Sequence, residues 1–90
     1  MKEETRNFYE NLMKAYNAEA TEYFKEWNFA KTNLQICWKI RTHSIGTCNS
    51  ELYKKANTII KRYEKSVDML FDLAIMYDKA SSEIWWMLYK

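Results

Sequence analysis

The sequence predicts an all-α protein, and three observations carry this prediction. Proline is absent and glycine occurs once, at Gly46, whereas sheet-based folds need frequent turns. Hydrophobic residues make up 48% of the chain, which supplies a folded core and excludes disorder. Apolar residues recur at alternating steps of three and four, the period of a helix with one buried stripe. We expect residues 1–90 to form a single helical domain.

The first helix is expected over residues 3–43. Glu3 and Glu4 lie in its first turn, where acidic side chains suit the helix dipole. We call its apolar stripe the first seam. It consists of Tyr9, Met13, Tyr16, Ala20, Tyr23, Trp27, Ala30, Leu34 and Cys37.

A turn and a second helix, over residues 50–89, are expected to follow. Gly46 is expected to adopt the left-handed conformation that ends a helix, and Asn49 or Ser50 to cap the next one. Two long seams on either side of one turn predict an antiparallel helical hairpin. The second seam consists of Tyr53, Ala56, Ile60, Tyr63, Val67, Leu70, Ala74, Tyr77, Ser81, Ile84 and Leu88.

Two places leave an alternative open. Residues 28–33 contain poor helix formers, and residues 80–83 resemble a second cap signal. A break at either place would give a three- or four-helix monomer instead of a hairpin.

The chain has more apolar residues than a hairpin buries, because each helix of a hairpin covers only one stripe. We therefore expect two hairpins to pair as a homodimer, a four-helix bundle. Residues 31–65 carry eight basic and two acidic side chains, while the rest of the chain carries six basic and ten acidic ones. Antiparallel pairing is favoured, since it lays the basic part of one copy against the acidic part of its partner.

Residues for catalysis or for holding a cofactor or metal are not recognisable, so we expect no enzymatic activity. His43 is the only histidine, and the two cysteines lack the spacing of a zinc site. Cys37 is expected to be a buried seam residue and Cys48 to lie in the turn, and whether they pair is left open. Since no signal peptide or membrane span is visible, a cytoplasmic location is expected.

Two groups of residues are candidates for binding. At the end of the chain, Trp85, Trp86 and Tyr89 are expected to contact a larger protein target, because Trp and Tyr are favoured at interface centres. A lysine-rich group near the turn is the alternative, since such surfaces bind phosphates of nucleic acids. Its members are Lys39, Arg41, Lys54, Lys55, Lys61, Arg62 and Lys65.

As a heptad hairpin expected to pair into an antiparallel four-helix bundle, the chain resembles the plasmid-copy-control Rop proteins, although it is longer. This resemblance implies a nucleic-acid-binding regulator that would use the lysine-rich group. The leading prediction is a non-enzymatic protein–protein interaction module, a small helical adaptor or inhibitor. Small viral or mobile-element proteins that block host machinery have a similar size and are similarly simple.

Overall fold

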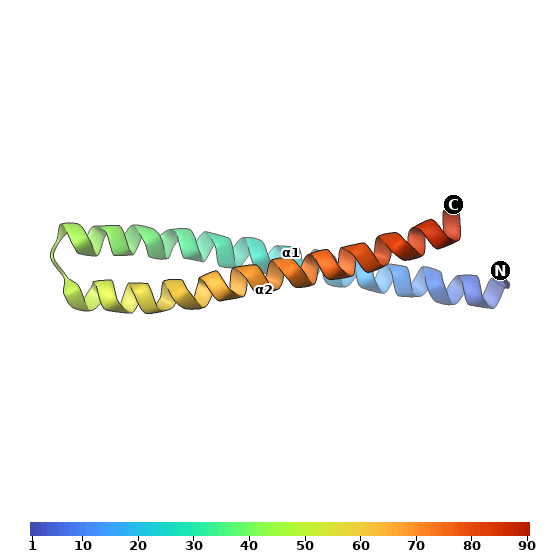
Figure 1. Ribbon diagram of the computed structural model, residues 1–90, viewed down its shortest axis with the longest axis horizontal. Helices are drawn as coiled ribbons and strands as arrows, with labels where there is room; N and C mark the ends of the chain where they lie inside the picture. The colour runs from blue at the N-terminus through green and yellow to red at the C-terminus, as the bar shows by residue number, and fades with distance from the viewer. The chain divides into compact units, whose positions relative to one another are not determined.

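The computed structural model describes all 90 residues and contains two α-helices (Figure 1). Helix α1 spans Glu3–Gly46 and helix α2 spans Ser50–Tyr89, with a turn at residues 47–49 between them. The prediction of an all-α helical hairpin is confirmed. Helix α1 ends three residues later than predicted, and α2 has the predicted bounds.

The contacts between the helices form two units. The turn unit, Glu26–Leu70, holds the end of α1, the turn and the start of α2. The terminal unit combines Met1–Lys25 with Phe71–Lys90, so that it contains both ends of the chain. Within each unit a segment of α1 packs against an antiparallel segment of α2 (Figure 1). The single domain expected over residues 1–90 stays a prediction.

The buried residues lie on the two seams, except Ser44, which is buried near the end of α1. In the turn unit Ala30, Leu34, Ala56 and Ile60 are buried, and in the terminal unit Ala20, Ala74, Ser81 and Leu88 are buried. Every other seam residue is half-buried except Tyr53, which is exposed. Tyr53 borders a shallow hollow near the turn, which Ser44 and Ile45 at the end of α1 also line.

Small and large side chains alternate along the seam of the terminal unit. The Tyr77 ring packs between Tyr16 and Tyr23, with ring centroids 5.8 and 5.7 Å apart. One turn further along α2, the Ser81 hydroxyl donates a hydrogen bond across the hairpin to the main-chain carbonyl of Met13, at 3.3 Å. A buried serine that reaches the backbone of the facing helix means that the two helices approach closely there, which small residues permit.

The turn closes α1 with a left-handed residue, but this residue is Cys48 and not Gly46. Cys48 has a φ of 57°, whereas Gly46 is the last helical residue and has no positive φ. The Cys48 amide donates to the carbonyl of Ile45 (3.2 Å), and the Asn49 amide donates to that of Ser44 (2.9 Å). These two bonds form the Schellman motif, in which glycine normally occupies the left-handed position. The expectation for Gly46 was wrong, because the closing hydrogen bonds of Cys48 and Asn49 place the left-handed position two residues later, and Gly46 stays within the last helical turn.

Asn49 starts the second helix as soon as the first has ended. Its side-chain oxygen accepts a hydrogen bond from the amide of Leu52 at 3.0 Å, and its carbonyl accepts one from Tyr53 at 3.0 Å. Asn49 is thus the N-cap of α2, as predicted, while its own amide closes α1. One residue that serves both helices makes the turn as short as it is.

Neither of the two suspected breaks occurs. Helix α1 runs through residues 28–33, where the Thr32 hydroxyl donates to the carbonyl of Asn28 at 2.9 Å. Helix α2 runs through residues 80–83, where Ser81 is buried on the seam. The chain therefore has two helices and not three or four.

Replacing Cys48 by glycine should stabilise the hairpin by roughly 1 kcal/mol, because glycine adopts the left-handed conformation without a steric penalty. Urea unfolding followed by circular dichroism, at one protein concentration, measures this difference. Cys48→Ala is the matched control, since it removes the thiol but keeps the β-carbon. Equal stability of the glycine and alanine variants would contradict the strain that we assign to Cys48.

Replacing Ile60 by alanine should lower the free energy of unfolding by about 2–5 kcal/mol, because Ile60 is almost fully buried on the seam. Ile75 is the control, since 43% of its surface is exposed, and Ile75→Ala should cost less than about 1 kcal/mol. Thermal unfolding of the two variants tests the seam directly. Similar losses at both positions would mean that the seam is not the main buried contact.

Candidate functional site

The three aromatic residues predicted to bind a partner form one surface, which we call the aromatic cluster: Trp85, Trp86 and Tyr89. The rings of Trp85 and Trp86 meet edge to face with centroids 5.0 Å apart, and Trp85 lies 5.6 Å from Tyr89. Each of the three residues keeps between 46% and 56% of its surface exposed. The cluster therefore offers apolar area that the chain itself leaves uncovered.

Helix α1 contacts the cluster from the other side of the terminal unit. The Tyr89 hydroxyl donates to Glu10 Oε1 at 3.2 Å, and Arg6 Nε donates to the same oxygen at 3.3 Å. The Arg6 guanidinium also lies 5.4 Å from the centre of the Tyr89 ring. At the free end, the Lys90 ammonium lies 5.3 Å from the ring of Trp86. The contacts of Arg6 and Glu10 link Tyr89 to α1, and because they are exposed to solvent each of them is weak.

Sequence reasoning found the three aromatic residues but missed Arg6, Glu10 and Lys90. The four-residue spacing of Arg6 and Glu10 signals an ion pair on one helix face. That this pair meets Tyr89 follows only from the register of the hairpin, which brings together residues 79 positions apart.

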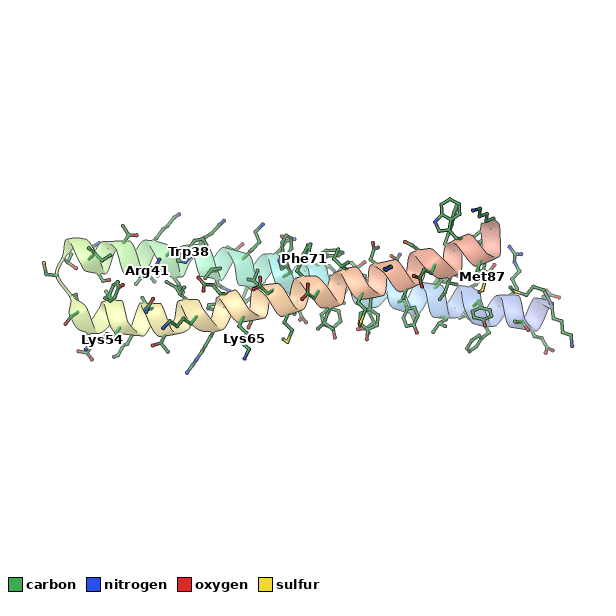
Figure 2. The ribbon with its side chains drawn as sticks, viewed as in Figure 1. Trp38, Arg41, Lys54, Lys65, Phe71 and Met87 are labelled. Carbon is green, nitrogen blue, oxygen red and sulfur yellow. The ribbon has the colours of Figure 1, made fainter.

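The basic face consists of five residues on α2 in the turn unit: Lys54, Lys55, Lys61, Arg62 and Lys65. All five are exposed, and their spacing places them on the side of α2 that faces away from α1 (Figure 2). Lys55 pairs with Glu51 at 3.4 Å, and both side chains are more than 70% exposed. Such an exposed pair is weak, so the face keeps its positive character.

The other two members of the lysine-rich group lie apart from the basic face. Arg41 continues the first seam and is half-buried, with its Nη1 donating to the side-chain oxygen of Asn57 at 3.3 Å (Figure 2). Lys39 is exposed on α1, beside Trp38. The structure thus brings together five of the seven residues, all on one helix.

A third feature is a face of exposed apolar residues. In the terminal unit, a shallow groove is lined by Leu12 from α1 and by Ala80, Ile84 and Met87 from α2, together with Tyr9, Tyr16 and Glu83. In the turn unit, 71% of Phe29 is exposed, and Ile36 and Ile59 are exposed as well. The sequence indicated an excess of apolar residues but not the groove that Leu12, Ala80, Ile84 and Met87 line in the terminal unit.

No group of three or more His, Cys, Asp or Glu side chains is placed to hold a metal ion. Neither helix has a segment long and apolar enough to cross a membrane. Comparison with known protein families, with characterised proteins and with solved structures found no match to this chain.

Proposed function

We propose that the protein is a non-enzymatic protein–protein interaction module, a small adaptor or inhibitor that binds a larger protein through its aromatic cluster. The observation that carries the proposal is the half-exposed group of Trp85, Trp86 and Tyr89, whose rings contact one another and whose Tyr89 hydroxyl bonds to Glu10. Trp, Tyr and Arg are the residue types that dominate binding energy at protein interfaces. An inhibitor of host machinery from a virus or mobile element is one form that such a module takes.

The geometry of the cluster favours a partner surface with a groove over a flat one. Adjacent tryptophans on a helix point about 100° apart, so a partner that covers both must present a groove or two walls. Because the rings already contact one another and Tyr89 is hydrogen-bonded, little side-chain freedom is lost when they are covered.

The protein acts, in this proposal, as an antiparallel homodimer of hairpins, a four-helix bundle. The support is the number of large apolar side chains that the hairpin leaves exposed, such as Phe29, Ile36 and Met76. Burying a side chain of this kind contributes roughly 1.5–3 kcal/mol, which favours association over exposure to water. The cytoplasmic location remains part of the same proposal.

Removing either tryptophan of the cluster should abolish capture of the target. Tagged protein is used to capture partners from a lysate with and without nuclease, and Trp85→Ala or Trp86→Ala should weaken binding of a nuclease-resistant partner by about 30-fold or more. Trp38→Ala is the matched control, since Trp38 is similarly exposed but lies in the turn unit. A partner that is lost equally with Trp38→Ala would contradict the assignment of the cluster.

A nucleic-acid-binding regulator is the second candidate, and the basic face of α2 is the observation that favours it. The turn unit carries eight basic and four acidic side chains, and the terminal unit carries six basic and eight acidic ones. Phosphate contacts would therefore concentrate on the turn unit.

If this second candidate holds, replacing Lys54, Lys61 and Arg62 by glutamine should strongly weaken binding to a labelled RNA duplex. The dependence of the logarithm of affinity on the logarithm of salt concentration should become shallower by about 2–3, because three phosphate contacts are lost. The control replaces Lys14, Lys25 and Lys79 of the terminal unit by glutamine, which changes the net charge equally. Equal effects of both triple variants would exclude a specific role for the basic face.

A further inference from the structure

Many large apolar residues outside the seams share one relation to them: they come directly before a seam residue, or before Arg41, which continues the first seam. Fewer of the exposed ones come directly after one, and these are Trp38, Phe71, Ile75, Trp85 and Tyr89. The apolar residues that come directly before, which we call the apolar face, include on α1 Leu12 before Met13 and Phe29 before Ala30. A residue one position before the seam lies about 100° around its helix from the seam. Because α1 and α2 are antiparallel within each unit, this rotation carries both stripes to the same side of that unit. The apolar face consists of Phe8, Leu12, Ala15, Phe29, Ile36, Ile40, Leu52, Ile59, Met69, Leu73, Met76, Ala80 and Met87.

The groove in the terminal unit shows this geometry directly, since Leu12 of α1 and both Ala80 and Met87 of α2 line it. The aromatic cluster lies on the opposite side of the same unit. Trp85 and Tyr89 come directly after the seam residues Ile84 and Leu88, and the contact of Tyr89 with Glu10, which follows Tyr9, is made on that side.

The charged residues that come directly before a seam residue lie on the same side as the apolar face, and they differ in sign between the two units. Every charged residue that precedes a seam residue in the terminal unit is acidic: Glu19, Glu22 and Glu83. In the turn unit the corresponding residues are Lys55, Arg62 and Glu26, with a positive balance. Glu22 and Lys55 have exposed partners on their own helices, Lys25 and Glu51, at 3.4 Å each. These weak pairs leave both charges available to a facing surface.

We propose that the apolar face is the dimer interface, occupied by the apolar face of a second copy of the chain. The terminal unit of each copy covers the turn unit of the other, so that Glu19, Glu22 and Glu83 face a surface on which Lys55 and Arg62 outweigh the single Glu26. The reversed arrangement would set each acidic group against its own symmetry copy, which opposes association. This inference rests on the homodimer of the proposed function and adds which face pairs and in which direction. It leaves the aromatic cluster uncovered.

Two adjacent residues of α2 test the choice of face. Met76 belongs to the apolar face, whereas Ile75 follows the seam residue Ala74 and lies on the other side, and the two are 53% and 43% exposed. We expect wild-type protein to be a dimer in sedimentation equilibrium at tens of micromolar. Met76→Lys should raise the dimer dissociation constant by about 10- to 100-fold, while Ile75→Lys should leave it unchanged.

The outcomes separate the two proposals. A monomeric wild-type protein would overturn the homodimer itself. A dimer that Met76→Lys and Ile75→Lys affect equally would overturn the apolar face as the interface and leave the homodimer standing. Circular dichroism of each variant identifies any loss of helix. If Met76→Lys fails to fold, the charge variants at Lys55 and Arg62 test the same interface.

Charge reversal tests the direction of pairing. Replacing both Lys55 and Arg62 by glutamate should raise the dissociation constant about tenfold, because acidic groups then face acidic groups in the antiparallel arrangement. Adding Glu19→Lys, Glu22→Lys and Glu83→Lys in the same chain should restore it. In a parallel dimer Lys55 and Arg62 would face their own symmetry copies, so replacing both by glutamate would exchange one like-charged contact for another. An unchanged dissociation constant would therefore overturn the antiparallel direction.

Discussion

Two helices that pack alone have a single line of contact, and this constraint decides what the rest of the surface looks like. The fully buried residues are mainly alanine and serine, with Ile60 as the largest. Close approach of the helices along such small residues leaves the larger side chains at the margins of the seam, where each is only partly covered. The exposed faces follow from this, because a chain rich in large apolar residues has nowhere within a hairpin to bury them.

Helical periodicity predicted the seam well because burial in a hairpin depends almost entirely on spacing. It failed at Tyr53, which borders the hollow near the turn and is exposed, because periodicity carries no information on how open the packing is there. The turn was harder to predict. The residue preference for glycine pointed to Gly46, whereas the closing hydrogen bonds of the turn place the left-handed conformation at Cys48. Here the geometry of closing one helix and capping the next at Asn49 overrides residue preference.

The candidate surfaces show the same division between local and long-range information. Trp85, Trp86 and Tyr89 lie within two turns of one helix, so the sequence alone places them together. Their contacts with Arg6 and Glu10 depend on the register of the whole hairpin. The lysine-rich group divides for the same reason, because nearness in sequence to the turn does not say which side of a helix a residue occupies. Arg41 falls on the seam, and its charge is directed to Asn57.

The short turn also sets the order in which the hairpin closes. The contact between Arg41 and Asn57 spans 16 residues, whereas that between Glu10 and Tyr89 spans 79. Closing the longer loop from an open chain costs about 1.4 kcal/mol more in entropy, since this cost grows with the logarithm of loop length. Folding therefore starts at Asn49 and proceeds like a zipper toward the chain ends, and thermal fraying starts at those ends. The aromatic cluster lies at the chain ends, so the partner that we propose would also hold these ends of the two helices together.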